Sequence, residues 1–152
     1  MYKSMLSKLL LIALIPLMLV SCDSIFDEGD VERSYDGPPV VAFFPLQTNA
    51  RVSNPEVALE VQLIGPQRDS ALDVSFEVDT EASTAVEGTH FEFVDASPVT
   101  IAAGTSTADL NILLQEDEDT DEEVVLVVNI TGTNADVDPA ENLRRATIFI
   151  AP

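Results

Sequence analysis

The sequence of 152 residues contains one cysteine, one histidine and no tryptophan. Because Cys22 has no partner cysteine, a disulfide within the chain is excluded. The single histidine, His90, also stands without a second histidine or thiol nearby. The nitrogen and sulfur ligands that a structural zinc site needs are therefore missing, and His90 is expected to be a turn or strand-end residue.

Basic residues are also scarce, with seven Lys and Arg against 27 Asp and Glu, for a formal net charge of −20. Both lysines, Lys3 and Lys8, fall within the first 21 residues, so the charge of the remaining chain is about −22. This balance excludes nucleic acid and anionic membrane surfaces as partners, because both would be repelled. Three interpretations of the acidity remain: solubility in a salty medium, cation binding, or a solvated face.

The common catalytic patterns are absent too. No serine lies in a G-x-S-x-G setting, and the sequence has no glycine-rich phosphate loop. Carboxylate pairs such as Glu92 and Asp95 could exchange protons, but paired acids occur throughout the chain and single out no site. The sequence therefore predicts a protein that is not an enzyme.

What the sequence does have is an apolar start. Lys3 and Lys8 precede an uncharged run, Leu9 to Val20, that is shorter than the roughly 20 residues needed to span a bilayer as a helix. A basic start, a short apolar core and small residues at its end are typical of a secretory signal peptide. Residues 1–21 are predicted to be such a signal, with Cys22 directly after it.

The residues around this cysteine, Leu19-Val20-Ser21-Cys22, resemble the lipobox of bacterial lipoproteins. The resemblance implies cleavage before Cys22, a diacylglyceryl group on its thiol and an acylated amine. Each buried CH₂ contributes about 0.8 kcal/mol, so such acyl chains would hold the protein to a membrane. The alternatives are a plain signal peptide followed by an incidental cysteine, or an uncleaved anchor.

Residues 22–37 are acidic and poor in large apolar side chains, which is typical of a flexible spacer. Fully extended, such a segment reaches about 50 Å, enough to clear the lipid head groups. An acidic patch shortly after a lipidated cysteine resembles an export signal of some Gram-negative lineages. The resemblance implies a protein of the cell envelope, anchored in the outer membrane and exposed at the cell surface.

From residue 38 to 152 the dominant hydrophobic period is two, which is typical of half-buried strands. Turn sequences such as "GPQRDS", "VEGT" and "AAGTS" separate the runs, and "DPAENLRR" (138–145) predicts a single helical turn. The fold class expected is all-β: an immunoglobulin-like antiparallel β-sandwich of about seven or eight strands. The candidate strands are Val40–Phe44, Val57–Leu63, Leu72–Val78, Phe91–Val94, Val99–Ile101, Leu110–Leu114, Val124–Ile130 and Ala146–Ile150.

Two stretches, "TEASTAVEGTHFEF" (80–93) and "VTIAAGTSTADLNILLQEDEDTDEEVVLVVNI" (99–130), resemble the Calx-beta domain. The shared pattern is Thr84-Ala85, Gly88, an aromatic at Phe91, Ala103-Gly104 and an acidic turn before a long apolar strand. "RRATIFI" matches the closing strand, so the similarity covers roughly residues 39–152. The chain is at least as similar to uncharacterised sandwich modules of bacterial surface lipoproteins.

Several Calx-beta domains bind Ca²⁺ through carboxylates from three loops at one end of the sandwich. Only one of those loops is convincingly acidic here, and Ala82 stands where the family commonly has Asp. The same loop fails as an EF-hand, because a glutamate replaces its glycine. Since Ca²⁺ needs 6–8 oxygens, the loop is either part of a Ca²⁺ site or a solvated turn. The candidate metal ligands are Glu116, Asp117, Asp121 and Glu122.

Together these features predict a non-catalytic, lipid-anchored envelope protein that displays a Calx-beta-like module. It would serve in adhesion or as an accessory subunit of a surface assembly, with an envelope protein or a surface polymer as partner. The alternative is a Ca²⁺-binding regulatory or adhesion module that uses the acidic loop 116–123.

Overall fold

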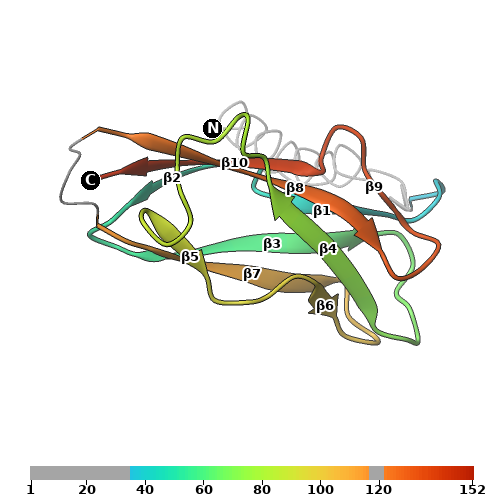
Figure 1. Cartoon of the computed structure of the whole chain (residues 1–152). Coiled ribbons are helices and arrows are strands. Elements are labelled where there is room, and N and C mark those ends of the chain that lie inside the picture. The colour runs from blue at the N-terminus through green and yellow to red at the C-terminus, as the bar shows by residue number, and fades with distance from the viewer. Residues whose placement is uncertain (1–34, 117–121) are drawn as a thin grey trace, which may run out of the picture. The chain divides into compact units, whose positions relative to one another are not determined.

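Ten β-strands in two sheets make up the part of the chain that the computed structural model describes, residues 35–116 and 122–152. One sheet has the order β5-β7-β3-β1-β9 and the other β2-β10-β8-β4-β6; they are called the first and second sheet below (Figure 1). The strands are β1 (Val40–Phe44), β2 (Gln47–Arg51), β3 (Glu56–Ile64), β4 (Leu72–Val78), β5 (Phe91–Phe93), β6 (Val99–Ile101), β7 (Thr107–Leu114), β8 (Val124–Thr133), β9 (Asp138–Pro139) and β10 (Arg145–Ala151).

The signal peptide predicted for residues 1–21, Cys22 and the spacer as far as residue 34 lie outside the described residues. From Tyr35 to Pro152 the chain forms one compact unit. Over its described ranges, no helix is long and apolar enough to cross a membrane.

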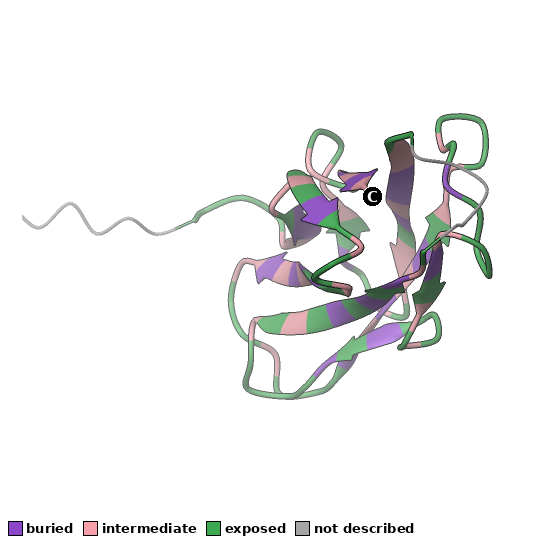
Figure 2. Cartoon of the chain, turned by 90° about the vertical axis from the view of Figure 1, so that its left-hand side faces the viewer, coloured by how far each residue is buried: buried purple, intermediate pink, exposed green. Residues whose placement is uncertain are grey.

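The sandwich forms because alternate residues of its strands are apolar. Along β3, for example, Val57, Leu59, Val61 and Leu63 are buried while their neighbours face outward. Since successive side chains of a strand point to opposite faces, each sheet presents one apolar face, and the two faces pack together. Figure 2 shows this alternation of buried and exposed residues along the strands. Among the residues described, no polar or charged residue is buried.

β8 differs because both of its faces are largely covered. Leu126, Val127 and Val128 are consecutive and all buried, and the strand lies between β10 and β4 in the second sheet. The strand predicted at Val124–Ile130 is therefore confirmed, and it is the central strand of the second sheet. A strand with a neighbour on each side satisfies its backbone groups without water, which suits a continuous apolar run.

The first strand segment crosses from one sheet to the other. β1 pairs with β3 in the first sheet, and after Pro45 and Leu46 the chain continues as β2, which pairs with β10 in the second sheet. The β2–β10 and β1–β9 pairs are parallel, whereas the other pairs are antiparallel. The expectation of an antiparallel sandwich is thus correct for most of the fold and wrong for these two pairs.

The all-β sandwich is confirmed, but its strands number about ten rather than seven or eight. β2 reads "QTNAR" and has no apolar alternation, while β9 is only two residues long. The composition of β2 and β9 does not indicate strands. They are extended because they pair with strands that lie far away in the sequence.

The single helical turn predicted for residues 138–145 is wrong for its first residues, because Asp138 and Pro139 pair with β1. A hydrogen-bonded turn that is not helical follows them, in which the Leu143 N–H donates to the Ala140 carbonyl at 2.9 Å. The local capping signal is therefore outweighed by strand pairing.

Two glycines allow turns that other residues would strain. Gly88 and Gly104 have φ angles of 80° and 75°, in the left-handed region that glycine adopts at little cost. Gly88 lies in the turn before β5, and Gly104 lies between β6 and β7. The expectation that "VEGT" and "AAGTS" form turns is confirmed.

The fold generates a prediction about its largest fully buried side chain. Phe91 is fully buried, and its ring meets that of Phe93 edge-on at 5.4 Å between centroids. Phe91→Ala is expected to lower the free energy of unfolding by about 3–5 kcal/mol, measured by urea denaturation. The control is Val94→Ala, since Val94 is 65% exposed, and its cost should stay within about 0.5 kcal/mol. Equal costs for the two variants would contradict the assigned core.

Candidate functional site

The described residues on either side of the acidic loop, Glu116 and Glu122, lie at one end of the sandwich, here called the acidic end. Glu56 at the start of β3 pairs with Leu113 of β7, and Val124 at the start of β8 pairs with Ile150 of β10. Arg51 at the end of β2 pairs with Ala151. The acidic end therefore combines residues 51–56, Glu116, Glu122, Glu123 and the end of β10. Strand ends from both sheets meet there.

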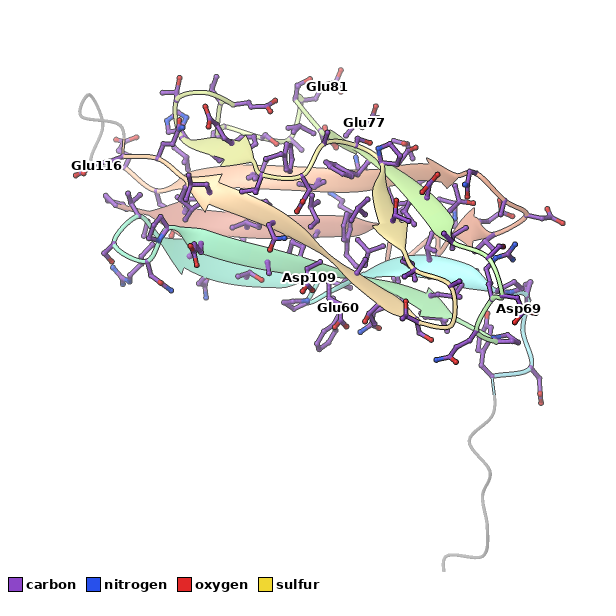
Figure 3. All side chains as sticks on the ribbon, turned by 90° about the horizontal axis from the view of Figure 1, so that it is seen from below. Glu60, Asp69, Glu77, Glu81, Asp109 and Glu116 are labelled. Atoms are coloured by element: carbon purple, nitrogen blue, oxygen red, sulfur yellow. The ribbon has the colours of Figure 1, made fainter. Side chains whose placement is uncertain are left out.

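The four candidate metal ligands are only partly placed. Glu116 and Glu122 are exposed and stand on either side of the gap, whereas Asp117 and Asp121 lie outside the described residues. Within residues 35–116 and 122–152, no three histidine, cysteine, aspartate or glutamate side chains come close enough to hold a metal ion. Figure 3 shows Glu81, from the loop after β4, well apart from Glu116. Among the described residues, the carboxylates thus do not form a metal site by themselves.

His90, the only histidine, has a local role. Its ring Nδ1 accepts a hydrogen bond from the Val86 N–H at 2.9 Å, and its own N–H donates to the Val86 carbonyl at 2.9 Å. These bonds close the turn that leads into β5. The prediction of a turn or strand-end residue is confirmed.

The loop after β4 continues the second sheet by means of its hydroxyl groups. The Val127 N–H donates to Ser83 Oγ at 2.9 Å, and the Val125 N–H donates to Thr84 Oγ1 at 2.8 Å. In return, the Thr84 and Ala85 N–H groups donate to the Val125 carbonyl. Because Ala85 is small and buried, the loop can lie against the edge of β8 where β4 has ended. The Thr84-Ala85 motif therefore has a structural explanation.

Asp79 fastens the same loop and was not singled out in the sequence. Its carboxylate accepts hydrogen bonds from the Ala82 N–H at 3.1 Å and from Asn129 Nδ2 at 3.3 Å. Arg145 Nη1 lies 3.2 Å from Asp79 Oδ2. The Ala82 N–H, and then Asn129 and Arg145, hold the pKa of Asp79 below its ordinary value of 3.8 against the opposing effect of desolvation. No sequence spacing connects these residues, because three separate segments supply them.

A groove of about 570 Å³ runs beside this acidic end, between the two sheets. One wall consists of Thr48 to Arg51 from β2, and the other consists of Glu56 to Ala58 from β3. The lining is completed by Asn54, Glu123, Phe149 and Ala151. The sequence did not indicate this groove, because it exists only where β1 leaves the first sheet and β2 joins the second.

Other acids lie on solvated faces of the sheets. Glu60 of β3 and Asp109 of β7 are directly opposite in the first sheet, and Figure 3 shows them together on its outer face. Like charges placed opposite one another are destabilising, and water and salt reduce the cost. Of the three interpretations of the acidity, a solvated face describes this pair.

The Asp79 contacts predict a pH-dependent contribution to stability. Because folding lowers the pKa of Asp79, its contribution is fully present above about pH 4 and is lost as the pH falls through the lower, folded-state value. Asp79→Asn should therefore lower the melting temperature at pH 7, and the difference from wild type should shrink below about pH 4. Thermal unfolding followed by circular dichroism measures both. Glu77→Gln is the control, because Glu77 is exposed on the neighbouring strand. A difference that stayed constant down to pH 2 would contradict the assigned cause.

Comparison with known proteins identifies a family and similar folds. A family model described as Domain of unknown function (DUF4843) matches residues 41–151. No curated protein matches the chain. The solved structure of the apo-form Calx CBD1 domain is 19% identical, with a TM-score of 0.62, over 76% of this chain and 97% of that one. The calcium binding domain CBD12 of CALX1.1 is 19% identical, with a TM-score of 0.58, over 73% of this chain and 43% of that one.

A two-domain protein with unknown function from Bacteroides fragilis is also similar, at 10% identity and a TM-score of 0.56, over 75% of this chain and 45% of that one. Identities this low show a shared fold only, and the fold is that of the Calx-beta sandwich. The family match is stronger, because it spans β1 to β10 almost completely. The chain therefore belongs to the DUF4843 family.

Proposed function

We propose that this chain is a lipid-anchored protein of the bacterial cell envelope that displays its DUF4843 sandwich as a non-catalytic binding or structural module. The observation that carries the proposal is Leu19-Val20-Ser21-Cys22, placed at the end of an apolar run and followed by an acidic stretch. Acyl chains on Cys22 would supply the membrane contact. The anchor lies in the outer membrane, and the sandwich faces the cell surface.

The carboxylates with several hydrogen-bond partners have structural roles that suit a non-catalytic module. Asp79 accepts a hydrogen bond from the Ala82 N–H, and this bond is the main cause of its lowered pKa. Another described carboxylate, Asp95, accepts hydrogen bonds from the backbone and side chain of Asn111 at 3.0 and 2.8 Å, which orders the chain after β5. These acids organise loops, in keeping with a scaffold that binds or supports a partner.

The partner in this proposal is an envelope protein or a surface polymer. The formal charge of about −22 after Cys22 disfavours contact with anionic lipid head groups and with nucleic acid. An acidic spacer of residues 22–37 would keep the sandwich away from the bilayer, since like charges along it favour extension. Adhesion or an accessory role in a surface assembly fits such a displayed module.

The anchor is tested by changing its attachment atom. In Cys22→Ser the thiol that carries the diacylglyceryl group is lost, so incorporation of a palmitate analogue should disappear. The precursor should also remain uncleaved at this position. Gel electrophoresis with fluorescence detection of the analogue measures both effects.

The matched control is Ser21→Ala, which keeps the cysteine and a small residue before it and should be labelled like wild type. Label that persisted on Cys22→Ser would contradict lipidation at this residue.

A second candidate function is Ca²⁺ binding at the acidic end. It is favoured by the positions of Glu116 and Glu122, which flank a loop rich in carboxylates, and by the likeness to a calcium binding domain. In this alternative Glu116, Asp117, Asp121 and Glu122 would supply oxygen ligands, and the ion would stiffen one end of the sandwich. Arg51 at the same end opposes it, because its positive charge repels a cation.

Calorimetry distinguishes the two functions. An ion present at 100 times its Kd would add about 2.7 kcal/mol to the stability of the folded chain, seen as a higher melting temperature in millimolar Ca²⁺. The principal proposal predicts no change beyond that caused by an equal ionic strength of NaCl. If the temperature rose in wild type but not in Glu116→Gln/Glu122→Gln, the Ca²⁺ function would be the correct one.

A further inference from the structure

The outer edge of β2 is the longest strand edge that the described fold leaves unpaired. Four strands lie at the ends of the two sheets: β5, β9, β2 and β6. β2 has five residues, whereas β5 and β6 have three each and β9 has two. Native proteins protect sheet edges by making them short or by adding charge and proline. β2 has no acid and no proline, and its one charged residue, Arg51, stands at its last position.

The hydrogen bonds to β10 determine which backbone groups of β2 face outward. The Thr147 N–H donates to the Leu46 carbonyl at 2.9 Å, and the Val52 N–H donates to the Ala151 carbonyl at 3.1 Å. Because backbone groups alternate along a strand, even-numbered residues of β2 face β10 and odd-numbered ones face away. The N–H groups of Gln47, Asn49 and Arg51 therefore point outward. At Arg51 this side is partly occupied, because its carbonyl accepts a hydrogen bond from the Asn54 N–H at 2.9 Å, so the open part of the edge is at Gln47 and Asn49. Within the described ranges, β10 is the only strand that pairs with β2.

The facing wall of the groove is also incomplete. β1 covers β3 only from Glu60 to Ile64, so Glu56 to Leu59 have no strand on that side among the residues described. This gap and the edge of β2 both line the groove of about 570 Å³. The volume falls within the range of 300–1,000 Å³ common for binding sites. Figure 1 shows that β2 and β10 lie side by side, with β3 in the other layer.

We propose that the outer edge of β2 is a docking site for an extended segment of a partner protein, which adds a strand to the second sheet. Main-chain hydrogen bonds to Gln47 and Asn49 supply affinity, and alternate side chains supply specificity. This inference deepens the proposed binding role and rests on it. The partner segment alternates small aliphatic residues with Lys or Arg.

The chemistry of the partner follows from the walls of the groove. Side chains that point between the sheets would meet Ala50 and Val57, which are apolar and leave room for aliphatic groups. The groove is also lined by two acids, Glu56 and Glu123, against one base, Arg51, so its charged lining favours cations on balance. A second copy of this chain is disfavoured as the occupant, because two bodies of about −22 repel one another.

A pair of substitutions at one position tests the proposal. Asn49→Pro removes an outward N–H and places a ring on the edge, but it leaves the bonds to β10 intact, so the fold should be kept. Asn49→Ala retains the N–H and is the matched control. The probe is a fluorescent synthetic peptide of alternating lysine and valine, titrated against the full chain in a non-ionic detergent and followed by anisotropy.

Wild type and Asn49→Ala should bind the peptide with affinities within about twofold of each other, whereas Asn49→Pro should bind about tenfold more weakly. A peptide with glutamate in place of lysine should also bind about tenfold more weakly to wild type. Amide hydrogen exchange at Asn49 should slow when the lysine peptide binds. No binding by wild type, or equal binding by the proline and alanine variants, would overturn the proposal.

If Asn49→Pro failed to fold, the peptide itself could be changed. Methylation of its alternate backbone nitrogens removes the donors on one edge, and affinity for wild type should fall about tenfold. Unchanged affinity would overturn strand addition. The anchor remains a separate question: a chain that is labelled at Cys22 but binds no peptide keeps the proposed anchor and loses this docking site.

Discussion

The fold depends on the burial of two apolar sheet faces against each other. Leu59, Leu110, Leu126 and Ile148 come from four different strands, and all are fully buried. With no tryptophan, the bulk of the core comes from aliphatic side chains and from Phe91, supported by Phe93 and Phe76. Burial stabilises such a core by about 25 cal/mol per Å² of apolar surface, so branched aliphatic residues suffice when strands alternate regularly.

The crossing of the first segment between sheets has the largest consequence for function. β1 pairs with only part of β3 in the first sheet, and β2 pairs with β10 in the second. The segment therefore leaves part of β3 and the outer side of β2 without a neighbouring strand. The result is a groove with unpaired backbone on both walls, next to the acidic end. The proposed docking site thus rests on the topology of the sandwich rather than on a cluster of reactive side chains.

The acids serve the fold in two ways. Most are exposed, and their mutual repulsion is tolerated because water and salt screen it. A few, such as Asp79 and Asp95, are exceptions that accept backbone hydrogen bonds and thereby hold loops against the sheets. An aspartate is therefore a solvated charge at Asp109 and holds a loop in place at Asp79, and only the neighbours distinguish the two.

Hydrophobic patterning by itself determined β1, β3 to β8 and β10. Most of these strands follow a period of two, which comes directly from the geometry of a strand, and β8 is marked by a continuous apolar run. Gly88 and Gly104 likewise marked turns, since few other residues adopt their conformation. Only the tertiary structure decided β2, β9, the parallel pairs and the Asp79–Asn129–Arg145 contacts. Each of these joins segments that lie far apart in the chain, and pairing between distant segments leaves no local pattern in the amino-acid sequence.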